Sequence, residues 1–94
     1  MQVVVTYDVN TMEKDGRRRL RRVAKQCENF GQRVQKSVFE ISVNNTQLAD
    51  LKRRLTREIN PDTDSLRFYF LSQTRKEIFG IDTYIDLENE TLIV

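Results

Sequence analysis

Few side chains in this sequence could perform acid–base or nucleophilic chemistry. Its 94 residues include no histidine, which excludes serine–histidine triads, cysteine–histidine dyads and histidine metal sites. The single cysteine, Cys27, falls on the apolar stripe of an expected helix, where a cysteine is most often a small core residue. The three glycines are too scattered to form a phosphate-binding loop. Carboxylates and arginines are therefore the groups left to act on a substrate.

Among the acids, Asp8 is the strongest candidate for a site. It stands at the end of an apolar run, residues 2–7, and is followed by Asn10 and Thr11. Two interpretations are open: an Asx turn that leaves the strand, or a hard oxygen ligand for Mg²⁺ or Mn²⁺. One carboxylate is too little for a nuclease site. Two copies of Asp8 facing each other across a dimer axis would suffice to hold a cation that activates water against a phosphodiester.

A basic cluster is the second candidate site. Five arginines occur within residues 17–22, and arginine makes bidentate contacts with phosphate. Residues 1–57 carry thirteen of the sixteen Lys and Arg side chains but only six of the fourteen Asp and Glu side chains. This asymmetry favours a surface that meets a polyanion such as nucleic acid. The alternative is a solvated helix face with no ligand.

The elements that must position these groups are predicted from the spacing of apolar residues. Helical spacing predicts helices over 17–29 and 46–59. Extended patterns predict strands over 2–7, 33–43, 66–71, 78–81 and 91–94. Within 33–43 the alternation slips at residues 35–37, as at a bulge or a tight turn between two strands. Two helices on one face of an antiparallel sheet indicate a ferredoxin-like α+β fold with extra C-terminal strands.

The length predicts one domain, residues 1–94, with a thin core that dimerisation would supplement. No apolar run approaches the roughly 20 residues of a membrane helix. The first seven residues carry no positive charge, unlike a signal peptide, and one cysteine fits a reducing compartment. We therefore expect a cytoplasmic protein without a membrane partner.

Two motifs of the sequence are Tyr7-Asp8-Val9 after the first strand and GQRVQKSVFE at residues 31–40. Both resemble the CRISPR-associated protein two family. The similarity extends to about Leu71, and the second motif resembles members of type I-C systems. The resemblance implies a symmetric homodimer with a ferredoxin-like βαββαβ core, so the slip at residues 35–37 becomes a turn between two strands.

The resemblance also implies which residues form the site. Asp8 matches the family's metal-binding aspartate, which implies a catalytic role with Mg²⁺, or with Mn²⁺ in its place. The residues that match family positions near the active cleft or the nucleic-acid surface are Tyr7, Arg17, Arg19, Arg33 and Phe39. The basic cluster adds Arg18, Arg21 and Arg22 to the residues expected to bind nucleic acid. The C-terminal segment, about residues 82–94, is expected to pack on the sheet of the partner subunit.

Two functions follow from the resemblance. The first is a metal-dependent endonuclease that hydrolyses phosphodiester bonds of double-stranded DNA or single-stranded RNA. The second is a non-catalytic dimeric scaffold that holds duplex DNA beside the CRISPR integrase subunit during spacer acquisition. A toxin-like ribonuclease of the same fold is a third alternative. Loss of cleavage without loss of spacer acquisition in an Asp8 variant would favour the scaffold.

Overall fold

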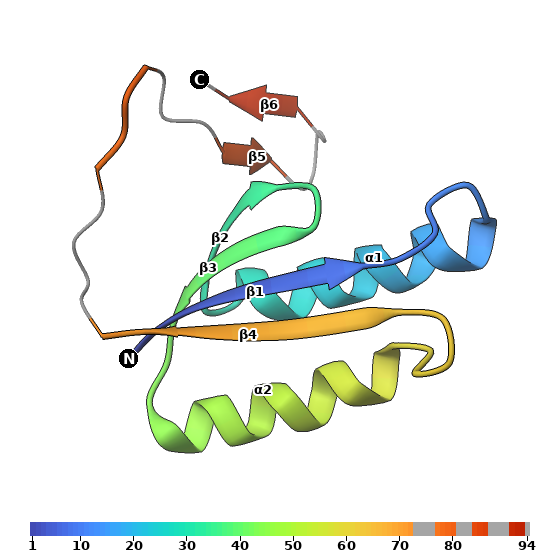
Figure 1. The fold of residues 1–94 in the computed structure, drawn as a ribbon, viewed down its shortest axis with the longest axis horizontal. Coiled ribbons are helices and arrows are strands. Elements are labelled where there is room, and N and C mark those ends of the chain that lie inside the picture. The colour runs from blue at the N-terminus through green and yellow to red at the C-terminus, as the bar shows by residue number, and fades with distance from the viewer. Residues whose placement is uncertain (73–76, 81–83, 87–90, 94) are drawn as a thin grey trace.

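The computed structural model describes residues 1–72, 77–80, 84–86 and 91–93. In chain order its elements are β1 (Gln2–Asp8), α1 (Lys14–Glu28), β2 (Gly31–Gln35), β3 (Val38–Ser42), α2 (Asn45–Glu58), β4 (Ser65–Leu71), β5 (Tyr84–Asp86) and β6 (Thr91–Ile93). Strands β1 to β4 form an antiparallel sheet in the order β2-β3-β1-β4, and both helices pack against one face (Figure 1). This confirms the ferredoxin-like α+β fold predicted from the sequence.

Strand β1 is central because it pairs with β3 on one side and β4 on the other. Its side chains alternate, so Val3, Val5 and Tyr7 are buried against the helices. Asp8 is the last residue of the strand and is exposed. By the same alternation, its side chain lies on the face of the sheet that the helices leave open.

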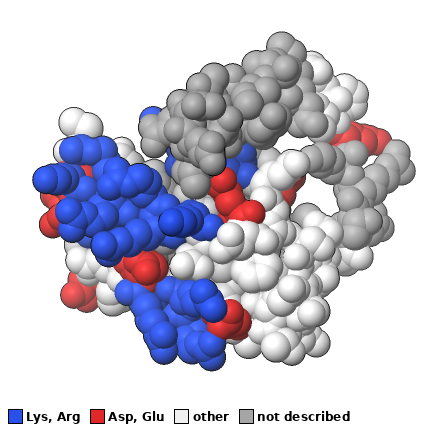
Figure 2. All heavy atoms as spheres, turned by 180° about the vertical axis from the view of Figure 1, so that it is seen from behind, with Lys and Arg blue, Asp and Glu red and all other residues white. Residues whose placement is uncertain are grey.

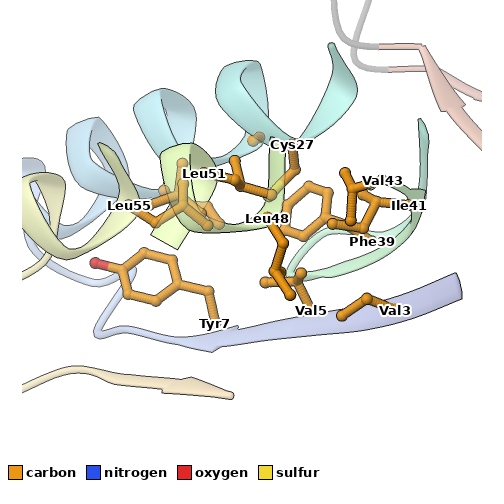
Figure 3. Close-up of a cluster of buried hydrophobic side chains, with 13 residues drawn as sticks. Val3, Val5, Tyr7, Cys27, Phe39, Ile41, Val43, Leu48, Leu51 and Leu55 are labelled. Atoms are coloured by element: carbon orange, nitrogen blue, oxygen red, sulfur yellow. The ribbon is translucent and has the colours of Figure 1, made fainter. Parts of the chain in front are cut away.

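The core fills the layer between the sheet and the two helices (Figure 3). Its fully buried large side chains are Tyr7, Phe39, Ile41, Leu51, Leu55, Val3, Val5, Val23 and Cys27. Burial, with a smaller contribution from the charge of Glu28, raises the pKa of the Cys27 thiol to about 12. The thiol is therefore protonated at neutral pH, and Cys27 is a core residue, as its helical spacing predicted.

The slip in alternation at residues 35–37 is a short connection between β2 and β3, as expected. The register of the two strands shifts between Arg33 and Gln35. Before this shift Arg33 pairs with the buried Phe39, so its side chain lies on the buried face of the hairpin. Its Nε donates a hydrogen bond of 2.8 Å to the carbonyl of Lys36, and its guanidinium lies 5.9 Å from the centre of the Phe39 ring. Arg33 and Phe39 therefore stabilise this hairpin from inside.

The C-terminal part of the described chain differs from the sequence prediction. Residues 78–80 do not form the expected strand, and Gly80 has a φ of 94°, which an extended strand does not use. Strand β5 follows instead and pairs antiparallel with β6, so the terminal strand has a partner within its own chain. Residues 81 and 94 of the expected strands lie outside the described residues. Packing of residues 82–94 on a partner subunit stays a prediction.

Across the described ranges, neither helix is both long and apolar enough to span a bilayer.

Candidate functional site

Asp8 lies in a small pocket where three segments meet. The pairing of β1 with β4 places Asp8 opposite Ser65. The amide of Tyr7 donates a hydrogen bond of 2.9 Å to the carbonyl of Ser37, which brings the β2–β3 turn to the same edge. The pocket has a volume of about 190 Å³ and is lined by Thr6, Tyr7, Asp8, Ser37, Ser65 and Arg67.

The oxygen atoms of this pocket fit a hard divalent cation. The Asp8 carboxylate is exposed, and hydroxyl-bearing residues Thr6, Ser37 and Ser65 line the same space. Mg²⁺ is commonly bound through one or two carboxylates while it keeps several waters. Nowhere in the described part of the chain do three or more His, Cys, Asp or Glu side chains gather as a metal cluster. One protomer therefore brings the Asp8 carboxylate alone to this pocket.

Arg67 is a site residue that the sequence analysis missed. It is the register partner of Thr6 on β4 and lines the pocket beside Asp8. A hydrogen bond to the Tyr69 hydroxyl, 3.4 Å from Nη1, and the nearby charge of Asp8 both raise the pKa of Arg67. The alternation of residues 66–71 could have placed Arg67 on the Asp8 face, but only once the register with β1 was known.

Asp64 is a second residue that the sequence analysis missed. It lies just before β4, and its side chain is fully buried. Its carboxylate accepts a hydrogen bond from the Tyr7 hydroxyl and two from Arg19, of 2.8 Å from Nε and 3.2 Å from Nη2. The backbone amide of Asn60 (2.9 Å) and the hydroxyl of Thr63 (3.0 Å) complete this set of donors.

These contacts fix the charge states of Tyr7 and Asp64. Burial acts to raise the pKa of Asp64, but the hydrogen bonds from Arg19, Tyr7, Asn60 and Thr63 outweigh it and lower the pKa to about 2. Burial and the hydrogen bond to Asp64 raise the pKa of Tyr7 to about 12. At neutral pH the pair is therefore a protonated phenol beside a charged carboxylate.

Helix α1 carries a basic surface that begins close to Asp8 in the chain. Basic side chains crowd one end of the face shown in Figure 2. The exposed ones on this helix are Lys14, Arg17, Arg18, Arg21, Arg22 and Lys25, which we call the α1 basic surface. Arg17 donates hydrogen bonds of 3.0 and 3.2 Å to the carbonyls of Thr11 and Met12, so it also holds the loop that follows Asp8.

The structure brings only some of the predicted nucleic-acid-binding residues to the surface. Arg17, Arg18, Arg21 and Arg22 are exposed, and Arg22 Nη1 lies 3.9 Å from Glu58. Tyr7, Arg33 and Phe39 are buried, with exposed fractions of 1%, 7% and 0%. The Arg19 side chain is 19% exposed and is held by Asp64. The polar groups of Tyr7, Arg19 and Arg33 bond within the protein, and Phe39 is a core residue, so a contact of these four residues with nucleic acid stays a prediction.

Comparisons with known proteins agree on one family. A family model described as CRISPR associated protein Cas2 matches residues 1–78. The CRISPR-associated endoribonuclease Cas2 of Chlorobaculum tepidum is 55% identical over 100% of both chains. The CRISPR-associated endonuclease Cas2 of Halalkalibacterium halodurans is 51% identical over 95% of this chain and 96% of its own.

A solved structure gives the same result. The crystal structure of Streptococcus pyogenes Cas2 at pH 6.5 aligns with a TM-score of 0.80 and 54% identity, over 85% of this chain and 100% of that chain. Identity at this level over nearly the whole length accounts for both the shared motifs and the shared fold. The chain therefore belongs to the CRISPR-associated Cas2 family.

Proposed function

We propose that the chain is a metal-dependent endonuclease of CRISPR spacer acquisition, which hydrolyses phosphodiester bonds in DNA or RNA. The observation that carries the proposal is the exposed Asp8 carboxylate in a pocket of hydroxyl groups beside Arg67. The α1 basic surface starts six residues further along the chain and supplies contacts for a nucleic-acid backbone. The names of the C. tepidum and H. halodurans relatives support a nuclease.

The residues of the pocket have distinct roles in this proposal. Asp8 would hold Mg²⁺ or Mn²⁺, with water and the hydroxyls of Ser37 and Ser65 completing an oxygen environment. When bound, such a cation activates water and neutralises charge on the phosphate that is attacked. Arg67 would bind a non-bridging phosphate oxygen, since guanidinium and phosphate match in charge and geometry. Arg17 holds the loop between Asp8 and α1.

A homodimer would complete the site, because one protomer supplies a single carboxylate. Two copies of Asp8 across a two-fold axis would hold one cation between them. Strand β4 lies at the edge of the sheet and exposes Tyr69 (48%), Phe70 (54%) and Leu71 (47%). An edge strand with large exposed apolar side chains is usually covered in a soluble protein, which supports dimerisation here.

Deleting residues 91–94 is expected to weaken the dimer and to lower metal-dependent cleavage together. The reason is that a terminal apolar strand of each subunit would pair with the sheet of the other and so stabilise the dimer. The same pairing would set the separation of the two Asp8 residues. Sedimentation at micromolar concentration measures the dimer, and a cleavage assay measures activity. A truncated protein that stays dimeric and fully active would show that the tail is not part of the interface.

The scaffold function is the second candidate, and the α1 basic surface favours it. Exposed arginines without a base-reading motif are suited to sequence-independent binding of duplex DNA. In this case the chain would bridge duplex DNA to the CRISPR integrase subunit, and cleavage would be dispensable. The assignment to a type I-C system stays a prediction, and no observation here favours the toxin-like ribonuclease.

Changing Arg18, Arg21 and Arg22 together to Ala is expected to weaken duplex DNA binding equally for all sequences. Each lost phosphate contact removes about 0.9 from the slope of log affinity against log salt concentration, so up to three contacts flatten it by about 3. Fluorescence anisotropy over a salt series measures this slope. A triple variant with an unchanged slope would mean that the nucleic acid binds to another surface.

The experiment that separates the two functions compares the wild type with Asp8→Ala. Both proteins are incubated with duplex DNA and single-stranded RNA in Mg²⁺, Mn²⁺ or EDTA, and spacer acquisition is measured in cells. The nuclease proposal expects cleavage by the wild type alone and only with metal. Spacer acquisition by the Asp8→Ala variant would assign the biological role to the scaffold.

A further inference from the structure

The buried carboxylate of Asp64 joins three segments that surround the proposed metal site. Its five hydrogen bonds come from Tyr7 on β1, from Arg19 on α1, and from Asn60 and Thr63 in the turn after α2. An ionised carboxylate offers about four lone-pair directions, so this set of donors saturates it. The Asp64 side chain is fully buried and has no room left for a ligand.

Asp64 and its hydrogen-bond partner Tyr7 are direct chain neighbours of two residues that line the pocket. Tyr7 immediately precedes Asp8 on β1, and Ser65, the cross-strand partner of Asp8, immediately follows Asp64. The hydrogen bond from the Tyr7 hydroxyl to Asp64 therefore ties the last residues of β1 to the first residues of β4 on the helix side of the sheet. Asp8 and Ser65 lie on the open side. Strand β1 ends at Asp8 and a loop leads from it to α1, so the pair of Asp8 and Ser65 is the last one in this ladder.

Arg19 connects Asp64 and the adjoining ends of β1 and β4 to the α1 basic surface. It lies between Arg18 and Arg21 in sequence, but its two bonds to Asp64 turn it inward while those neighbours are exposed. A bidentate arginine–carboxylate pair has a defined geometry. The buried Arg19–Asp64 contact, together with the bonds from Arg17 to the loop after Asp8, thus sets the spacing between the exposed arginines of α1 and the Asp8 carboxylate.

We infer that Asp64 is a positioning residue, which holds the end of β1 against β4 and α1 so that Asp8 and the α1 basic surface face one substrate in a fixed geometry. This inference rests on the proposed function for its effect on cleavage, but the geometry that it assigns to Asp64 is measurable without activity. The low pKa of Asp64, about 2, keeps the carboxylate charged throughout the physiological range. Asp64 itself touches no substrate.

The test uses a pair of small changes and a matched control. Tyr7→Phe removes one hydroxyl and its bond to Asp64, whereas Asp64→Asn keeps the shape and removes the charge. Leu48→Ala is the control, because it empties a core position on the first turns of α2, at the opposite end of that helix from Asn60. It lowers thermal stability without touching the Asp64 contacts.

Hydrogen exchange and cleavage are measured on the dimeric full-length protein well below each melting temperature. We expect Tyr7→Phe to lower kcat by about ten- to a hundredfold with little change in KM, because misplaced groups lose rate rather than binding. Exchange should accelerate at residues 7–12 and 64–66. Leu48→Ala should keep the wild-type kcat and the wild-type exchange at these residues.

Two results would overturn the inference. One is exchange at residues 7–12 and 64–66 that is unchanged in both Tyr7→Phe and Asp64→Asn. The other is an equal loss of kcat in Leu48→Ala, since activity would then follow stability alone. If the wild type neither cleaves nor binds Mn²⁺, the proposed function fails, and hydrogen exchange alone decides the role of Asp64.

Discussion

Replacing Asp8 by Asn is expected to abolish metal-dependent cleavage while the fold and the dimer persist. Asn keeps the shape of the side chain and its ability to form an Asx turn, but it lacks the charge that holds a hard cation. A bound metal supplies several kcal/mol of transition-state stabilisation, and about 4 kcal/mol corresponds to a loss of roughly a thousandfold in rate. A time course with Mg²⁺ and with Mn²⁺ measures the loss.

The stability of this variant should match that of the wild type, because the Asp8 side chain is exposed and is not part of the hydrophobic core. Asp62→Asn is the matched control, since Asp62 is an exposed aspartate outside the pocket. Both variants are purified in parallel with the wild type, so that a contaminating nuclease would show itself in all three. Cleavage at the wild-type rate by a clean Asp8→Asn preparation would contradict Asp8 as the metal ligand.

The largest loss of stability is expected from Asp64→Ala. This change leaves the Arg19 guanidinium, whose side chain is 19% exposed, and the buried Tyr7 side chain without their partner. Removing one member of a fully buried ion pair costs about 3–5 kcal/mol, and the partial exposure of Arg19 places the expected cost at the lower end of that range. A small domain has a free energy of unfolding of only about 5–15 kcal/mol, so this variant would be close to unfolding. Urea denaturation followed by circular dichroism measures the difference.

The same carboxylate predicts how stability depends on pH. Its pKa is about 2 in the folded protein against 3.8 for the free side chain, so folding favours the charged form. The stability from this shift, roughly 2 kcal/mol, is fully present above pH 4 and is lost as the pH falls from about 4 to 2. We expect Asp64→Asn to unfold with a weaker pH dependence in that window. An unchanged dependence would show that other carboxylates govern acid unfolding.

Much of the fold could be predicted because local pattern and packing agree. The apolar stripe of α1, from Leu20 to Cys27, and the alternation in β4 depend only on neighbouring residues. The break in alternation between β2 and β3 left a bulge or a turn open, and the family resemblance selected the turn. The C-terminal part was predicted poorly, since short strands such as β5 depend on their pairing more than on their own sequence.

The site could be predicted only in part for a related reason. Asp8 could be predicted as a candidate because it ends a strand, which is a local signal. Asp64 and Arg67 were missed because their roles arise from the register between β1 and β4, residues almost sixty positions apart. Conversely, Arg33 and Phe39 were expected at the nucleic-acid surface, but they are cross-strand partners on the buried face of the hairpin, with the Arg33 guanidinium 5.9 Å from the centre of the Phe39 ring. Sequence alone does not give such cross-strand geometry.

The central claim is that Asp8 holds a divalent cation shared by two subunits, and the binding of Mn²⁺ tests it most directly. Electron paramagnetic resonance of Mn²⁺ titrated into the wild type and Asp8→Asn counts bound ions per chain without any substrate. We expect one Mn²⁺ to bind for every two wild-type chains. At the Mn²⁺ concentrations that saturate the wild type, we expect no bound Mn²⁺ in Asp8→Asn. Equal binding by both proteins, or no binding by the wild type, would contradict it.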